Sequence, residues 1–290
     1  MTLPPFDFAH ENYPLAPLTL YNVGGPARIA LLPRTKEEAL QAFDWMRQYD
    51  GPKTVLGGGS NVLVVDEGFP GVVLVTTGLT ALESLGDDRY YIEAGVVLDR
   101  LVREIMIANN YDLVGGLTGI PGSVGGAIYM NAGTVNGTTC QLMESVEVAK
   151  VDGVHAIPMH ESLYGYRGQT YCPRGSLILS GVFKFTKTDV PQLPIYERYI
   201  QRRKETQPQG RCCGSVFKNP PNEHSGRLIE ACGLKGTRIG GAVISEKHAN
   251  FIMNEDNATC NDILALIALA KRTVKEKHNI DLHEEVVLIR

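Results

Sequence analysis

The sequence lacks the features that mark a protein bound to nucleic acid or to a membrane. It has no long basic run, and 28 basic against 32 acidic residues give a net charge of -4, which disfavours nucleic-acid binding. The longest apolar run, residues 263–270, is far shorter than the ~20 residues that cross a bilayer. The first residues have neither a basic start nor an apolar core. No signal peptide is therefore expected, and the expected location is the cytoplasm.

Cysteine and histidine are present, but not in the patterns of a metal site or a disulfide framework. The six cysteines include no C-x-x-C pair and the seven histidines no H-E-x-x-H pair, so no protein-held metal is expected. Cys212 and Cys213 are adjacent, and a disulfide between neighbours would be strained. A chain of 290 residues, 43% hydrophobic, can form about two domains without disulfides.

Hydrophobic periodicity and end signals predict helices and strands in mixed order. Thr35 and Glu38 form a capping-box pattern before a helix expected over 36–49, and Thr259 and Asp262 form another before a second helix. A third helix is expected over 98–109. Strands are predicted within 53–66 on both sides of a glycine loop, and within 71–78, 89–97, 145–153, 176–185 and 281–290. Because helices and strands do not alternate regularly, the fold class is predicted to be α+β.

Two glycine-rich segments are candidates for binding a phosphate group. The first, Gly57, Gly58, Gly59, Ser60 and Asn61, lies between two β-rich runs, unlike a Rossmann loop, which opens a helix, and it lacks the Gly-Lys-Ser/Thr ending of a Walker A loop. Successive backbone amides here could cradle a phosphate. A tight hairpin with no ligand explains this segment equally well.

The second segment, "GGLTGIPGSVGGAIYMNAG" over 115–133, has seven glycines. So many glycines cost backbone entropy on folding, which favours a close approach of the backbone to a ligand over a plain surface loop. Ser123 is placed to cap a short helix whose N-terminus would face an anion. Two such segments in one chain indicate a long ligand with a pyrophosphate.

Several stretches together resemble the UDP-N-acetylenolpyruvoylglucosamine reductases of bacterial peptidoglycan synthesis, the MurB family. They follow the family's order across nearly the whole chain, and they are far more specific together than singly. The stretches are "NVGGPARIALLP" (22–33), "VLGGGSNVLVVDEGFPGVVL" (55–74), "GIPGSVGGAIYMNAG" (119–133), "YGYR" (164–167), "CGSVFKNP" (213–220), "GRLIEACGLKGTRIGGAVISEKHANFIMN" (226–254) and "LHEEV" (282–286).

The resemblance implies a vanillyl-alcohol-oxidase-type FAD-binding domain of two α+β subdomains over 15–187, split near 75–80. A substrate-binding α+β domain would follow over 188–290. It also implies a reaction in which NADPH reduces FAD and the reduced flavin passes hydride to the enolpyruvyl group of a UDP-sugar. The FAD contacts implied by the two glycine segments are Gly57, Gly58, Gly59, Ser60, Asn61, Gly119, Ile120, Pro121, Gly122, Ser123, Gly125, Gly126 and Ala127.

Matched to the family motifs, three residues would carry the chemistry. Ser215 would be the proton donor, Arg167 the cation at the substrate carboxylate, and Glu285 the acid that polarises the enolate. From the residues alone, Ser215 could equally be a turn hydroxyl and Arg167 a surface ion-pair partner. Alternation along the last strand allows only one of Glu284 and Glu285 to face the site. Lys204, Lys218, Asn219 and His248 would bind substrate. A core histidine without a ligand explains His248 equally well.

The chain departs from the family pattern in three places. Val287 stands where relatives often have arginine, and Tyr21-Asn22 replaces a run that often contains arginine. The short interval between Arg167 and Ser215 is typical of the shorter type, which lacks the loop whose tyrosine closes over the substrate. Two alternatives remain at this stage: an alcohol oxidase or dehydrogenase of the same FAD fold, and a nucleotide-binding protein without catalysis. A monomer or a weak dimer is expected.

Overall fold

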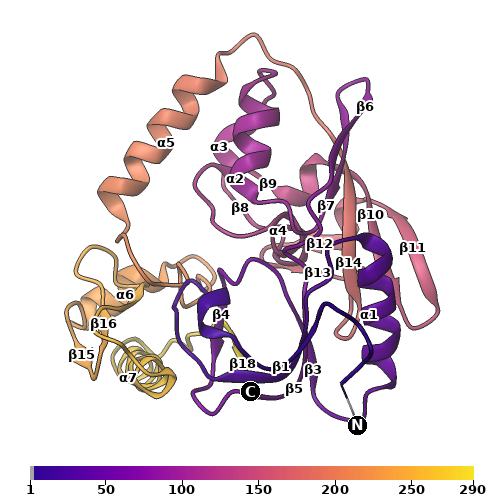
Figure 1. The fold of residues 1–290 in the computed structure, drawn as a ribbon. Helices are drawn as coiled ribbons and strands as arrows, with labels where there is room; N and C mark the ends of the chain where they lie inside the picture. The colour runs from indigo at the N-terminus through magenta and orange to yellow at the C-terminus, as the bar shows by residue number, and fades with distance from the viewer. Residues whose placement is uncertain (1–2) are drawn as a thin grey trace. The chain divides into compact units, whose positions relative to one another are not determined.

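The computed structural model describes residues 3–290 (Figure 1). The chain forms two compact units, each assembled from separated segments. The first unit holds the residues up to Glu11, Ile29–Gly58 and Gly71–Arg203. The second unit holds Asn12–Arg28, Gly59–Pro70 and Lys204–Arg290. Within residues 3–290, no helix combines the length and the apolar character that a bilayer crossing requires.

Two sheets carry most of the strands between residues 9 and 184. The first has the order β1-β2-β5-β3 and the second the order β11-β10-β14-β7-β6. The first sheet contains β1 (Ala9–Pro14), β2 (Pro26–Leu31), β3 (Lys53–Leu56) and β5 (Phe69–Val75). The second contains β6 (Leu82–Gly86), β7 (Arg89–Glu93), β10 (Met143–Lys150), β11 (Gly153–Pro158) and β14 (Leu177–Lys184). Two-residue strands form the hairpins β8–β9 (Gly133–Thr134, Gly137–Thr138) and β12–β13 (Tyr164–Gly165, Gly168–Gln169).

The first helix, α1 (Lys36–Gln48), begins where its end signal predicts. Thr35 Oγ1 accepts a hydrogen bond from the Glu38 backbone amide at 3.2 Å. The Glu38 carboxylate reaches the amide of Arg34, one residue before the cap, instead of the Thr35 amide that a capping box would use. Phe43 and Met46 of α1 are buried in a core that also includes Leu177 of β14.

The helix predicted over 98–109 forms, but most of it is wound more widely than an α-helix. A single α-turn, α2 (Leu98–Arg100), leads into a π-helix, η2 (Leu101–Ile107). The predicted apolar face is buried, since Leu98, Leu101, Val102, Ile105 and Met106 all belong to the core of the first unit. The other α-helices before residue 210 are α3 (Val114–Leu117), α4 (Val124–Met130) and α5 (Gln192–Thr206). Short 3-10 helices are η1 (Ala16–Leu18), η3 (Thr139–Leu142) and η4 (Glu161–Leu163).

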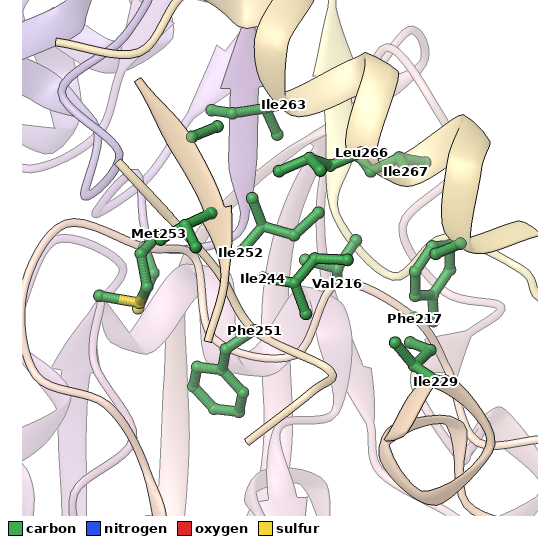
Figure 2. Packing of buried hydrophobic residues seen from close by; sticks show 14 of the residues in the cluster. Val216, Phe217, Ile229, Ile244, Phe251, Ile252, Met253, Ile263, Leu266 and Ile267 are labelled. Atoms are coloured by element: carbon green, nitrogen blue, oxygen red, sulfur yellow. The ribbon is translucent and has the colours of Figure 1, made fainter. Parts of the chain in front are cut away.

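The second unit packs short strands under one long helix. It contains β15 (Arg238–Ile239), β16 (Ala242–Ile244) and β17 (Ile252–Asn254) in one antiparallel sheet, together with α6 (Ser225–Ala231) and α7 (Cys260–His278). β4 (Val62–Val64) pairs in parallel with β18 (Val287–Ile289). Figure 2 shows α7 residues Ile263 and Leu266 packed with Ile244 and Ile252 of the strands.

The units do not end at the predicted boundary near 188. Residues up to Arg203 belong to the first unit, because α5 packs there: the Tyr196 hydroxyl donates to Asp99 Oδ1 at 3.4 Å, and the Tyr199 ring lies against Gly115. The chain passes from the first sheet to the second between Val75 and Leu82. The limits of the FAD-binding and substrate-binding domains themselves stay predictions.

The predicted capping box of α7 is formed in full and provides a stability test. Thr259 Oγ1 accepts from the Asp262 amide at 3.1 Å, and Asp262 Oδ2 accepts from the Thr259 amide at 2.9 Å. Losing such a cap costs about 1 kcal/mol, so Thr259→Ala should lower the free energy of unfolding by about that amount in urea melts. Thr273→Ala, in the same helix but away from its start, is the control; an equal loss there would contradict the cap assignment.

Candidate functional site

The two glycine-rich segments meet, backbone against backbone, in the first unit. The Gly58 amide donates to Ser123 Oγ at 3.1 Å. A Cβ at Gly58 would lie 2.7 Å from the Ser123 nitrogen, and one at Gly57 would lie 2.8 Å from Ser123 Oγ. Glycine is therefore needed for the segments to approach each other, and together they form a surface poor in side chains. Such a surface fits a dinucleotide whose pyrophosphate binds to backbone amides.

Ser123 differs from its predicted use. It is the residue before α4, as expected, but its hydroxyl makes no bond to that helix. The hydroxyl instead accepts from Gly58. The predicted side-chain cap is therefore wrong, while the predicted helix start is confirmed.

The hairpin interpretation of residues 57–61 is also wrong. The strand before the segment, β3, pairs in parallel with β5, and the strand after it, β4, pairs in parallel with β18. The two strands of a hairpin pair with each other, whereas β3 and β4 pair with different partners. Gly59 in this loop has φ +62 and lies so close to Leu18 that a Cβ would be 1.8 Å from the Leu18 carbonyl oxygen.

The remaining predicted FAD contacts lie on the segment from the end of α3 through α4. Gly119 and Gly122 have φ values of +70 and +108, which L side chains rarely adopt. Gly125 faces inward, since a Cβ there would lie 2.6 Å from Ala94 Cβ, whereas a Cβ on Gly126 would meet nothing closer than 3.7 Å. Gly126 therefore leaves space beside the backbone. Direct contacts of these residues with FAD stay predictions.

Ser215 and Glu285 are brought together within the second unit. The Glu285 amide donates to the carbonyl of Val216, the residue after Ser215, at 2.8 Å. Two positions further, the Lys218 amide donates to the His283 carbonyl at 2.9 Å. Two stretches that are distant in the sequence thus run beside each other, and Ser215 lies at the start of this pairing.

The Glu285 backbone is fixed from a second side by Asn61. Asn61 Nδ2 donates to the Glu285 carbonyl at 3.0 Å, and the Val287 amide donates to the Asn61 carbonyl at 3.0 Å. Asn61 was predicted as an FAD contact, and this second relationship was not visible in the sequence. The neighbouring Glu284 is engaged at the surface, with its Oε1 2.6 Å from Lys271 Nζ. This ion pair supports the choice of Glu285 over Glu284.

A cavity of about 290 Å³ lies beside Ser215 in the second unit. Of the four predicted substrate-binding residues, Asn219 and His248 line it, but Lys218 and Lys204 do not. Lys204 instead accepts a hydrogen bond through its carbonyl from Lys247 Nζ at 2.8 Å. Lining residues that the sequence did not reveal are His224, Gly226, Arg227, Glu230, Lys247, Ala249 and Asn250. One sequence signal could have pointed to Lys247 as a lining residue, because it directly precedes His248 in "SEKHANF".

His248 is held as a neutral ring with a defined tautomer. Its Nδ1 accepts from the Asn250 amide at 3.2 Å, and its ring centroid is 4.8 Å from that of Phe251. Burial lowers the pKa of His248, with the charge of Lys235 as a lesser cause of lowering. Because Nδ1 is the acceptor, the hydrogen of the neutral ring is on Nε2, so His248 can act as a hydrogen-bond donor through that atom.

Arg167 lies in the two-residue loop between β12 and β13 of the first unit. Its φ is +54, its Nη2 donates to the Gly133 carbonyl at 3.2 Å, and its guanidinium is 5.2 Å from the Tyr166 ring centroid. Arg167 is thus fixed at the end of the second glycine segment. Arg203 is nearby: burial first and the Arg167 charge second lower the pKa of Arg203.

The cysteines beside Ser215 are buried and unreactive in character. All six cysteines are free and buried, and burial raises the pKa of every thiol. The pKa of Cys213 is raised to about 12, with the Glu285 charge as a minor contributor. Since the thiolate is the nucleophile, Cys212 and Cys213 are expected to fill space in the core and not to react.

A thiol titration tests this conclusion directly. At pH 8 the thiols are expected to stay protonated, because burial raises the pKa of Cys140 and Cys172 to about 11 and of Cys213 and Cys260 to about 12, and raises the pKa of Cys212 and Cys232 above the ordinary thiol value. The folded protein should therefore react negligibly with Ellman's reagent until denaturant is added, when six thiols should appear. Rapid labelling of Cys212 or Cys213 in the folded state would contradict it.

No group of three or more His, Cys, Asp or Glu residues within 3–290 is placed to hold a metal ion. The groups at the site are instead hydroxyl, guanidinium, amide, imidazole and carboxyl. Such groups can bind an oxygen-rich substrate, stabilise negative charge and deliver a proton.

Two family models match the chain in succession. An FAD binding domain matches residues 27–156, and the C-terminal domain of UDP-N-acetylenolpyruvoylglucosamine reductase matches residues 206–289. The predicted α+β chain, with an FAD-binding domain followed by a reductase C-terminal domain, is thereby confirmed.

Curated relatives and a crystal structure match over nearly the whole chain. The UDP-N-acetylenolpyruvoylglucosamine reductases of Myxococcus xanthus and Bacillus subtilis are both 38% identical, over 94% and 96% of this chain and 89% and 93% of their own lengths. The crystal structure of the reductase (MurB) from Thermus caldophilus has a TM-score of 0.81 at 35% identity, covering 96% of this chain and 97% of that one. The chain therefore belongs to the UDP-N-acetylenolpyruvoylglucosamine reductase family.

Proposed function

We propose that this protein reduces the enolpyruvyl group of UDP-N-acetylglucosamine enolpyruvate to give UDP-N-acetylmuramate, a precursor of peptidoglycan. NADPH is the reductant and FAD the cofactor. The observation that carries the proposal is the pairing of the Ser215 and Glu285 segments beside a polar cavity, in a chain whose relatives bear the name of this reductase. The cytoplasmic location and the monomeric or weakly dimeric state stay predictions.

The chain's own residues must manage charge and a proton. FAD, when bound, supplies the hydride that the substrate accepts. Negative charge then develops next to the substrate carboxylate, where the guanidinium of Arg167 and a protonated Glu285 would stabilise it. The Ser215 hydroxyl donates the proton that completes the reduction. No step requires a thiolate, in agreement with the high pKa values of the cysteines.

The substrate's nucleotide end would be bound in the second unit. Asn219 and His248 line the cavity beside Ser215, so the amide and the Nε2–H of the imidazole can donate to oxygens of the diphosphate or the sugar. Lys204 and Lys218 lie outside that lining and are weaker candidates. Lys247 and Arg227, which line it, are better placed to contact an anionic group.

An anaerobic experiment tests the proposal. NADPH is added to the purified yellow protein until the flavin absorbance is lost, and then UDP-N-acetylglucosamine enolpyruvate is added. Recovery of the absorbance without air would support reduction of this substrate. A flavin that stays reduced until air enters would exclude it and favour the oxidase alternative. That alternative also predicts flavin in the pellet after acid precipitation, although no His or Cys lies within 57–61 or 119–133 to tether it.

A further inference from the structure

Asn250 makes an unusually complete set of hydrogen bonds beneath the Ser215 segment. Its residue is only 3% exposed. Its carbonyl accepts from the Val216 amide at 2.8 Å, its Oδ1 accepts from the Phe217 amide at 2.9 Å, and its Nδ2 donates to the Phe217 carbonyl at 2.8 Å. Its own amide donates to His248 Nδ1 at 3.2 Å. One buried residue is therefore bonded to two different parts of the site.

These bonds fix the backbone on which Ser215 depends. Val216 is held on one side by Asn250 and on the other by Glu285, whose amide donates to the Val216 carbonyl at 2.8 Å. Phe217, the next residue, is clamped through both its amide and its carbonyl by the Asn250 side chain. A serine side chain has a single rotatable bond to its hydroxyl oxygen, so the position of Ser215 Oγ follows closely from the position of this backbone.

We propose that Asn250 is a positioning residue for the reaction, whose side chain sets the place of the Ser215 hydroxyl relative to Glu285. The inference rests on the proposed function, because it concerns delivery of a proton by Ser215. Asn250, Ser215 and His248 line the same cavity. The side-chain amide of Asn250 is committed to Phe217, and it acts through its neighbours.

The expected effect of removing the clamp is large because proton transfer is sensitive to distance. A displacement of ~1 Å at a reacting group can cost about 100-fold in rate. Asn250→Ser removes both bonds to Phe217 and should slow flavin reoxidation by the enolpyruvyl substrate about 100-fold. Reduction of the flavin by NADPH should be unchanged, because that half-reaction does not use Ser215.

Asn254 supplies a matched control for a purely structural role. It is 5% exposed in the same core, and its side chain also makes two bonds to the backbone: Nδ2 donates to the Tyr21 carbonyl at 2.9 Å, and Oδ1 accepts from the Ala258 amide at 2.8 Å. Neither bond holds residues 215–217. Asn254→Ser should therefore lower the melting temperature much as Asn250→Ser does, without slowing reoxidation.

The experiment compares the two variants with wild type in the holoenzyme. The measurements are the two half-reactions, the solvent deuterium isotope effect on reoxidation, and hydrogen exchange of the segment containing Phe217. The proposal expects Asn250→Ser alone to show slow reoxidation, a larger isotope effect and faster exchange at that segment. Equal slowing in both variants, or equal slowing of both half-reactions in Asn250→Ser, would overturn it.

Two further outcomes are distinguishable. If Asn250→Ser does not fold, Asn250→Asp keeps the shape and an acceptor for the Phe217 amide but loses the donor to the Phe217 carbonyl, and the same comparison applies to it. If wild-type flavin is not reoxidised by the enolpyruvyl substrate at all, the proposed function fails and this role fails with it. A role limited to stability is instead revealed by active wild type and equal losses in the Asn250 and Asn254 variants.

Discussion

Ser215→Ala should oxidise NADPH at the wild-type rate but lose nearly all reduction of the enolpyruvyl group. General acids contribute about 10²- to 10⁴-fold to a rate, and a methyl group at this position has no proton to give. The flavin of the variant should bleach normally with NADPH and then recover its absorbance with substrate slower by about that factor. Stopped-flow absorbance measures both steps in one sample.

Ser215→Cys is the informative partner of this variant. A thiol is close in size to a hydroxyl and, with a pKa of about 8.5, is a stronger acid, so part of the substrate-dependent step should return. If Ser215→Ala slowed both half-reactions equally, the serine would act in folding or in flavin binding, and its assignment as proton donor would be wrong. If the alanine variant were fully active, another group would deliver the proton.

Arg167→Ala should lower kcat of the substrate step by about 10²- to 10³-fold, the usual cost of removing one well-placed group from a developing negative charge. The loss should appear in kcat more than in KM, because the charge next to the carboxylate grows only as the reaction proceeds. Arg167→Lys should recover part of the rate, since it keeps the charge but loses the planar fork. Steady-state kinetics at saturating NADPH measures these effects.

The structure indicates that this variant will fold. Arg167 already has a left-handed backbone with φ +54, so alanine adds no backbone cost that arginine lacks. The exposed Arg174, in a turn of the same unit, is the control, and Arg174→Ala should leave both steps unchanged. A rise in KM with kcat intact would show that Arg167 contributes equally to binding of substrate and transition state, which would contradict the role proposed here.

Local signals were the most dependable guide from sequence to fold. The starts of α1 and α7 follow from Thr35 and Thr259, because a cap depends on residues within one helical turn. The hydrogen bond of the Ser123 hydroxyl could not be predicted in the same way, since its partner Gly58 is distant in the sequence. The π-helical winding of residues 101–107 could not be predicted either, because the residues that it buries are those expected for an ordinary α-helix.

In the candidate site, too, motifs could be predicted from the sequence but long-range hydrogen bonds could not. Ser215, Glu285 and His248 were predicted from family motifs, and the structure adds that the segments of Ser215 and Glu285 share a backbone pairing. The roles of Asn61 and Asn250 were missed, because nothing in an isolated asparagine tells which distant carbonyl it will bind. The cavity also changed the choice of cations, from Lys204 and Lys218 to Lys247 and Arg227.

The pairing of β4 with β18 has a consequence for synthesis on the ribosome. Asn61, next to β4, binds Glu285 across 224 positions of sequence, and β4 pairs only with β18 in the residues that the structure describes. Asn61 and the residues of β4 must therefore wait for these partners until almost the entire chain has been translated. We expect the nascent second unit to remain sensitive to proteases until this late closure, whereas the first unit can fold while the rest is still being made.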